Sequence, residues 1–588
     1  MIQRDSMAQG KTNRRVAMFN GKRLSGWMAL AVFATVGGAM VAADPAFAKV
    51  DVDKLTIGGE IRERYEFRTN DTFNAGRGGS AIGSTAGTFG LAQKGNESLA
   101  SSRVRVDVGY DLTPDVSFFA QIQDARAFGS EGFSTANFGS SGAQVVSQTN
   151  SQLTGLDLHQ GYIQLKNVLV PGLSVKAGRQ EITFGDHRLF GNFGWSQIGN
   201  SFDGVRLTHS TDMADVDLFW ARIIDNAAVG FQNNNNNIPF PAASGTTQST
   251  GNQDIYGAYV TLKPVKNWTI EPYYFLLQDA RPTQLNGAAA STVTGLGATQ
   301  TTFSSILQAQ AASQTRNFLG GRINGKAGSG VVMDFTYEGN YQFGSITSQC
   351  NRSVTAAQCG LINGTGAVAL GSVGGTRDAH INAHQHALRT GLTFDAVPMK
   401  PRLGFEFDYA SGDKCANGPQ VVATNASSCG TDKPRTFNTA DNLYPTNHFH
   451  YGYMDLMSWK NMVVYAIKFD VKPSPVSKFQ IDYNIMRLAN TADNWYRAGQ
   501  AVYFTSKATN QEASLGQEVD LHYWHTFKEK FKFELGYGVF HPGAYISKSS
   551  SADVLGFSGT QGSASNGFGN QSQIVNQQWG YVMGSIKF

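Results

Sequence analysis

Short segments in which apolar and charged residues alternate are the feature that most limits what this chain can fold into. From Leu55 to Arg68 the odd positions are mostly apolar, while most even positions carry charge. The charged even positions are Glu60, Arg62, Arg64, Glu66 and Arg68. A period of two indicates a β-strand with two unlike faces. A face with this many charges is not expected in a protein core. It is expected on the water-facing inner side of a barrel wall whose other side faces lipid.

The same alternation recurs along the chain. Residues 103–110 place Arg103, Arg105 and Asp107 opposite a row of apolar side chains, and residues 531–539 repeat the pattern with Lys532 and Glu534. Applied to the whole sequence, the template predicts 18 strands of about ten residues, the length that a tilted strand needs to cross a bilayer. They are expected to begin near residues 55, 102, 116, 156, 173, 202, 215, 253, 268, 315, 331, 381, 402, 459, 477, 514, 531 and 577.

Connections between these strands alternate between short and long. The short ones lie around Asp111, Pro171, Asp212, Pro264, Gly328, Pro398, Pro473 and Glu529, and the long ones include 68–101, 280–314, 344–380 and 411–456. The sequence therefore predicts an all-β fold: a single closed 18-stranded antiparallel transmembrane β-barrel with short periplasmic turns and long extracellular loops. A secreted sandwich is the alternative, but it would not line one face of so many strands with charge.

The N-terminal region has the pattern of a targeting signal. Basic residues precede an apolar run from Trp27 to Ala43, and the small residues Ala46 and Ala48 fit a signal-peptidase site. We therefore expect residues 1–48 to be a signal peptide and residues 49–588 to form the barrel; an uncleaved N-terminal anchor is the alternative. Six of the 48 Lys and Arg residues and two of the 44 acidic residues lie in this leader, which leaves 42 of each sign. The balance gives no reason to expect a nucleic-acid partner.

Four cysteines fall into two close pairs within polar segments. The pairs are Cys350 with Cys359 and Cys415 with Cys429. In an exported protein they suggest two loop disulfides. A four-cysteine zinc site is the alternative, but the sequence lacks the CxxC spacing that such sites use.

Two sequence blocks resemble the alginate export family of outer-membrane barrels. The first runs from Gly178 to Leu207 and includes Gly178, Arg179, Gln180, Glu181, Gly185, Asp186, His187, Arg188, Ser201, Phe202, Asp203 and Gly204. The second runs from Phe407 to Asn461 and includes Asp408, Tyr409, Asp413, Tyr444, Pro445, Thr446, Asn447, His448, Tyr451, Gly452, Tyr453 and Trp459. The resemblance implies an 18-stranded porin-like barrel in the outer membrane of a Gram-negative bacterium. It also implies a polyuronate path through an arginine-rich pore constricted by loops.

Charged side chains on the predicted lumen faces are the candidate pore residues. Those of the N-terminal half are Arg62, Arg64, Arg103, Arg105 and Arg206; those of the C-terminal half are Arg322, Arg389, Glu406, Asp408, Glu518 and Asp520. Rows of arginine favour anions in a pore, and the planar guanidinium suits carboxylates. Alternatively, these charges pair across the lumen and keep the barrel wet and rigid.

Arg179, Asp186 and Arg188 lie beside the loop of about 17 residues that joins the fifth and sixth predicted strands. This connection folds inward as a constriction in one interpretation and packs at the surface through Phe190, Phe193 and Trp195 in the other.

Other chemistry has little support in the sequence. His380, His384 and His386 share one face of a predicted strand, but a metal site needs convergent ligands, so they are expected to be rim residues and no metal or other cofactor is expected. No nucleophile elbow, phosphate loop or zinc-helix motif is present, so we expect no catalytic residues and a protein that is not an enzyme.

The sequence favours a passive outer-membrane channel for small hydrophilic solutes, with a preference for anionic, carboxylate-bearing or sugar-acid solutes. The alternative is an export barrel for an anionic exopolysaccharide such as alginate, working with periplasmic components. The outer-membrane lipids, including lipopolysaccharide, are the expected surroundings in either case.

Overall fold

A computed structural model describes residues 51–69, 96–128, 156–224, 252–280, 314–348, 377–414, 435–500, 502–504, 506, 510–549 and 575–588. The chain divides into two compact units, Met1–Asp53 and Lys54–Phe588. The second unit contains every strand of the structure. The predicted signal peptide and all four cysteines lie outside the described residues, so the leader and the two disulfides stay predictions.

The described chain is made mostly of strands and contains almost no helix. In the first half they are β1 (Leu55–Thr69), β2 (Asn96–Thr113), β3 (Val116–Ala127), β4 (Leu156–Leu165), β5 (Leu173–Gln180), β6 (Phe202–Ser210), β7 (Ala214–Ile224), β8 (Gln253–Val265), β9 (Trp268–Asp279) and β10 (Gln314–Ser329). They continue as β11 (Val331–Ser348), β12 (Arg377–Phe394), β13 (Arg402–Ala410), β14 (Arg435–Phe437), β15 (Met462–Ser474), β16 (Ser477–Arg487), β17 (Trp495–Tyr496), β18 (Val502–Phe504), β19 (Ser514–Phe527), β20 (Phe531–Pro542) and β21 (Gln577–Lys587). A 3-10 helix (Val52–Lys54) and the α-helix α2 (Ala544–Lys548) complete the list. No described helix is long and apolar enough to cross a bilayer.

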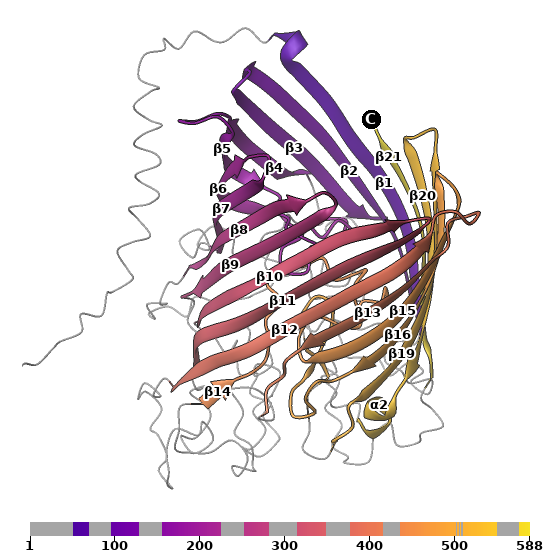
Figure 1. The fold of residues 1–588 in the computed structure, drawn as a ribbon. Helices are drawn as coiled ribbons and strands as arrows, with labels where there is room; N and C mark the ends of the chain where they lie inside the picture. Colours follow the sequence, from indigo (N-terminus) through magenta and orange to yellow (C-terminus); the bar gives the residue numbers. More distant parts are fainter. Residues whose placement is uncertain are drawn as a thin grey trace, which may run out of the picture. The chain divides into compact units, whose positions relative to one another are not determined.

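A closed ring of 18 antiparallel strands forms the barrel, which confirms the predicted fold class. Within the ring, each strand pairs with the next ring strand along the sequence, and β1 pairs with both β2 and β21 (Figure 1). The short strands β17 and β18 pair with each other as a separate two-stranded sheet. The C-terminal residue completes the seam, because the Gly59 amide donates to the Phe588 carbonyl over 3.0 Å and the Phe588 amide donates to the Gly59 carbonyl over 3.1 Å. β14 adds to the sheet as a parallel partner of β12.

The wall has its apolar face outside and its charged face inside. On β1, Ile57 and Tyr65 are 64% and 48% exposed, whereas Arg62 and Arg64 are only 5% and 7% exposed. This reverses the arrangement of a soluble sheet and is what a lipid-facing wall requires. The C-terminal strand agrees, since Val582, Ile586 and Phe588 all lie on the exposed face.

Strand boundaries differ from the predicted ones in a few places. β2 begins at Asn96 rather than near 102, and β12 begins at Arg377 rather than near 381, because hydrogen-bonded pairing continues beyond the apolar belt. β15 begins at Met462 rather than near 459, because Ser458–Asn461 belong to a segment inside the barrel, where Trp459 is fully buried. The alternation of apolar residues marks only the part of a strand that faces lipid.

Candidate functional site: the inner segments of the barrel

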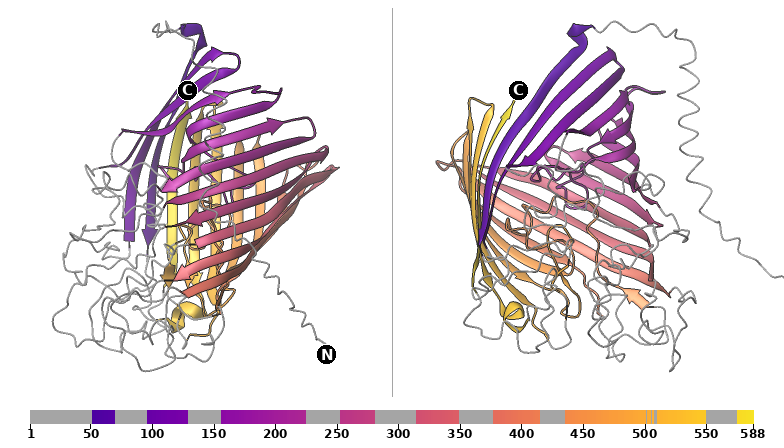
Figure 2. Two further views of the ribbon diagram at one scale, coloured as in Figure 1. Left: turned by 90° about the vertical axis from the view of Figure 1, so that its left-hand side faces the viewer. Right: turned by 180° about the vertical axis from the view of Figure 1, so that it is seen from behind.

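The connection between β5 and β6, residues 181–201, folds into the barrel and contacts the lumen faces of the strands. A second connection, residues 438–461 between β14 and β15, does the same, and both lie within the ring of strands in the view from behind (Figure 2). We call these the first and second inner segments. The inward interpretation of the β5–β6 connection is therefore the one that the structure shows.

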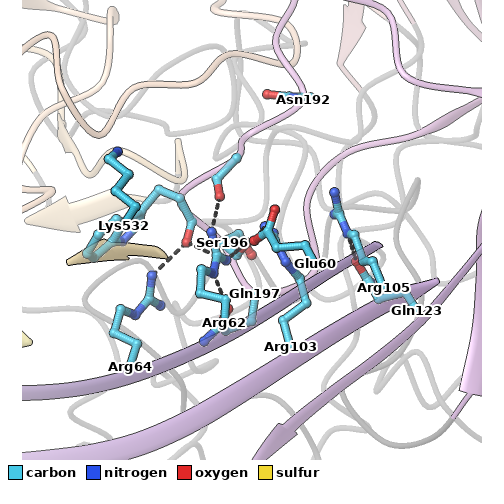
Figure 3. A network of polar contacts seen from close by, with 12 residues as sticks. Glu60, Arg62, Arg64, Arg103, Arg105, Gln123, Asn192, Ser196, Gln197 and Lys532 are labelled. Carbon is cyan, nitrogen blue, oxygen red and sulfur yellow. Dashed lines mark hydrogen bonds and ion pairs between the residues drawn. The ribbon is translucent and has the colours of Figure 1, made fainter. Parts of the chain in front are cut away.

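Arginines of β1 hold the first inner segment by its backbone. Arg62 donates to the carbonyl oxygens of Gly194 and Ser196, each over 2.6 Å, and its Nε donates to Gln197 Oε1 over 2.7 Å. Arg64 donates to the Trp195 carbonyl over 2.6 Å. Because consecutive carbonyls point at these side chains, the segment has one preferred position against this wall (Figure 3).

Arginines of β2 extend this contact. Arg103 donates to the Ser196 carbonyl over 3.1 Å and pairs with Glu60 over 2.6 Å. Arg105 donates to the Ile198 carbonyl over 3.1 Å and to Gln123 over 2.7 Å. These predicted lumen residues do face the interior, but in the structure their partners are protein groups.

The opposite wall holds the inner segments with carboxylates. Arg188 of the first segment forms ion pairs with Glu406 and with Asp408, the latter over 2.8 Å. Glu518 accepts a hydrogen bond from the Met454 amide over 2.9 Å, and Asp520 accepts one from the Tyr453 amide over 3.5 Å. The basic wall therefore binds carbonyl oxygens, and the acidic wall binds N–H groups and a guanidinium.

The two inner segments are joined to each other like a pair of strands. The Tyr444 amide donates to the Leu189 carbonyl and the Gly191 amide donates to the Tyr444 carbonyl, both over 2.9 Å. The Thr446 amide donates to the His187 carbonyl over 2.8 Å. A hydrogen-bonded pair of segments anchored to two walls is a rigid element.

An aromatic cluster fixes the contact between the second segment and the arginines. The Trp195 ring lies parallel to the His448 ring at 3.9 Å, and the Arg64 guanidinium lies 4.0 Å from the centre of the same indole. His448 Nδ1 is 3.0 Å from an Asp455 oxygen, which sets the orientation of the imidazole. Trp195, which the alternative interpretation placed at the surface, thus lies among buried side chains.

Asp186 joins the first inner segment to two strands of the wall. Its two oxygens accept hydrogen bonds from Arg322 of β10 over 2.6 Å and from Arg389 of β12 over 2.7 Å. Burial alone would raise the pKa of Asp186, but Arg389 and Arg322 together lower it below its usual value. The carboxyl is therefore ionised and joins the segment to two strands.

His450 of the second segment also contacts this residue. Its Nε2 is 2.8 Å from the Asp186 backbone carbonyl, and burial lowers the pKa of His450 well below its usual value, with Arg188 adding to the effect. The neutral ring must carry its proton on Nε2, because a carbonyl oxygen can only accept a hydrogen bond.

Arg179 is the exception among the candidate pore residues. It lies on the face of β5 opposite Lys176, in register with Asp203 of β6, and pairs with that residue over 2.9 Å. The prediction placed it at the pore, but Lys176 and Arg206 occupy the inward positions of these strands. The period of two along β5 places Arg179 on the outer face, although it stands next to the inner segment in the sequence.

Some residues that hold the inner segments were not among the candidates. Arg68 donates to the Met454 carbonyl over 2.9 Å, and Arg316 donates to the Thr439 carbonyl over 3.2 Å. Both have the parity of residues that were identified, Arg64 and Arg322, so the alternation alone could have found them.

The histidines of β12 lie on the outer face. His384 and His386 are 3.2 Å apart through their ring nitrogens, and His386 Nδ1 is 2.9 Å from the Tyr337 hydroxyl. Within the described parts of the chain, no group of three or more His, Cys, Asp or Glu side chains is arranged to hold a metal ion.

The model of the family described as "Alginate export" matches residues 53–554. The chain belongs to the alginate export family. Together with the closed ring of strands, this membership shows a porin-like barrel of the Gram-negative outer membrane. None of the curated proteins matches the chain.

Several solved structures match the chain at low sequence identity. They include Acinetobacter baumannii OccAB1 (11% identity, covering 93% of this chain and 99% of that one, TM-score 0.47). Pseudomonas aeruginosa OprD (9% identity, 90% and 93%, TM-score 0.46) and OccK11 (9%, 91% and 96%, TM-score 0.45) also match.

Proposed function

We propose that this family member is a diffusion channel for small hydrophilic solutes and that it prefers anionic ones, such as carboxylates or sugar acids. The observation that carries the proposal is the exposure of paired charges on the lumen faces. Lys532 is 47% exposed while its partner Glu534 is 10% exposed, and Lys478 is 35% exposed while Asp470 is 8% exposed. In the pairs Arg206–Asp217 and Arg389–Asp186 the cation is likewise the more exposed partner. Beneath the first inner segment the order is reversed, because Glu66, Glu60 and Glu181 are more exposed than their arginine partners. Where cations are the more exposed partners, a passing ion meets positive charge first.

Arg62, which holds the first inner segment, contributes positive electrostatic potential to the lumen. Arg62 donates to Gln197 and to backbone carbonyls, which are neutral acceptors. A hydrogen bond to a neutral group satisfies the donor but leaves its charge in place, so Arg62 still contributes a positive field. The acidic residues of β13 and β19 oppose this field, which is why we expect modest selectivity, strongest at low salt.

Reversal potentials in a KCl gradient across a planar bilayer test the proposal. We expect an anion-selective wild type and a shift toward cations in Lys478→Glu/Lys532→Glu. The matched control is Lys400→Glu, because Lys400 lies in the short turn between β12 and β13 and pairs with Asp395 there. A cation-selective wild type, or equal shifts in both variants, would contradict the proposal.

Polymer export is the second candidate, and the family match is the observation that favours it. An exporter of an anionic polysaccharide needs the same positive lumen, but its ion current should be blocked by uronic-acid oligomers. Adding oligomers of increasing length to either side of the bilayer separates the functions. Export is favoured if oligomers added on the short-turn side block the ion current more strongly as they become longer. A general channel is favoured if oligomers of all lengths block the current weakly and equally.

A further inference from the structure

The outer wall of β5 to β8 carries a row of alternating charges. Arg179 lies opposite Asp203 in the strand register, Asp203 lies opposite Arg222, and Arg222 lies opposite Asp254. Each residue is near the end of its strand that leads into a long connection. We call these four residues the outer charge row.

Close contacts hold the row together. Arg179 pairs with Asp203 over 2.9 Å, and Arg222 Nε donates to Asp254 over 2.7 Å. The Trp220 indole also donates to Asp254, over 3.1 Å. Asp203 is 61% exposed, so the row is accessible from outside the barrel.

The row faces away from the lumen. The next positions on the same faces are Ala177, Val205, Trp220 and Tyr256, and further toward the short turns the face is apolar, with Leu218 48% exposed. A charged side chain costs about 2–4 kcal/mol at the bilayer midplane but close to nothing at the interface. The charges, with an indole and a phenol just below them, therefore mark the level of the lipid headgroups.

The geometry points to a binding site for the phosphorylated headgroup of lipopolysaccharide in the outer leaflet. The guanidinium groups of Arg179 and Arg222 suit phosphate, because a planar fork of donors matches its oxygens. The carboxylates of Asp203 and Asp254 suit the divalent cations that accompany such phosphates, since these cations prefer oxygen ligands. A row with both signs is complementary to a layer of phosphates and divalent cations.

Charged outer positions gather on the side of the barrel formed by β3 to β8, where Arg126 and Asp124 of β3 form a further outward pair over 2.7 Å. At the same end of the wall, the outward side chains that the structure describes on β11 to β13 include Tyr341, Phe343, His384 and Tyr409. That surface offers aromatic and imidazole groups instead of Arg–Asp pairs. A lipid with a charged headgroup therefore has a preferred position at β5 to β8.

Titration of the detergent-solubilised barrel with fluorescent lipopolysaccharide in the presence of Mg²⁺ tests the site. The variant replaces all four residues, Arg179→Gln, Asp203→Asn, Arg222→Gln and Asp254→Asn, so that no charge is left unpaired. We expect it to bind about tenfold more weakly than wild type. The matched control, Lys400→Gln/Asp395→Asn, removes an exposed ion pair from a short turn and should bind like wild type.

Two further probes identify the ligand chemistry. Dephosphorylated lipopolysaccharide and phosphatidylethanolamine should both bind wild type about as weakly as the variant binds the native lipid. If the variant binds lipopolysaccharide as wild type does, or wild type binds all three lipids equally, the row is only a set of ion pairs within the wall. Unchanged ion conductance confirms that a variant is folded; if the fourfold variant does not fold, Arg222→Gln/Asp254→Asn replaces it.

Discussion

Arg62 of the barrel wall and Gly194 of the first inner segment are joined by a hydrogen bond of 2.6 Å from guanidinium to carbonyl. The bond shows what the arginine row of β1 and β2 does in the structure. These side chains, chosen from the sequence as pore residues, hold a segment inside the barrel by its backbone. Their charge and their mechanical role are separate properties and can be tested separately.

Replacing Arg62 and Arg64 with glutamate should release the first inner segment from this wall. Carboxylates would face the carbonyls of Gly194 and Trp195, and acceptors placed opposite acceptors repel. We expect a several-fold rise in single-channel conductance, with frequent current fluctuations.

Glutamine at the same two positions is the matched control, because it removes the charge but keeps a donor for the carbonyls. It should shift selectivity more than conductance. If Arg62→Glu/Arg64→Glu keeps the wild-type conductance, the segment is held by other contacts.

Replacing Arg188 should destabilise the folded barrel more than most other single substitutions. Its side chain is 2% exposed and pairs with Glu406 and Asp408, which are 1% and 0% exposed. Arg188→Met leaves two buried carboxylates without this partner, at a cost of about 3–5 kcal/mol in the free energy of unfolding. Urea unfolding in detergent micelles measures the loss.

A triple variant distinguishes a missing charge from a missing shape. Arg188→Met/Glu406→Gln/Asp408→Asn removes the carboxylates as well and should recover much of the lost stability. Equal instability in the single and triple variants would indicate that packing around Arg188, not charge, is the cause.

The period of two made most of the fold predictable. It separates lipid-facing Tyr65 from lumen-facing Arg64 without any knowledge of neighbouring strands, because each wall residue has lipid on one side and the interior on the other. The same period places Arg206 of β6 on the face of Lys176 and Arg179 of β5 on the opposite face.

What the arginines bind could not be read from the alternation. Three of the partners of Arg62 are backbone carbonyls more than 130 residues away in sequence. A carbonyl has no sequence signature, so only the path of the inner segment reveals the contact. Likewise, Tyr444 and Leu189 pair through backbone groups that any residue carries.

Acidification should loosen the contact between Asp186 and its two arginines. Arg389 and Arg322 lower the pKa of Asp186 against the opposing effect of burial, so the carboxyl stabilises the fold above its unfolded pKa, 3.8. That contribution is lost as the pH falls through the lower, folded-state pKa. Unfolding of wild type and Asp186→Asn should therefore differ most above about pH 4 and converge in stronger acid. A difference that stays constant down to strong acid would show that Asp186 acts through something other than its charge.

Gly191 tests how closely the two inner segments must approach. A side chain added there would place its Cβ 2.2 Å from Thr446 Oγ1 and 2.7 Å from His187 Cβ, distances at which atoms overlap. Gly191→Val should therefore separate the segments and break the hydrogen bond from the Gly191 amide to the Tyr444 carbonyl, while the wall and its ring of strands stay intact. We expect a folded barrel of near-normal stability whose conductance rises and fluctuates.

Gly330→Val is the control, because nothing lies within 4 Å of a Cβ added at Gly330, although its φ of +76° makes any side chain there strained. If Gly191→Val carries a current of wild-type amplitude without added fluctuations, the paired inner segments do not restrict the path of ions.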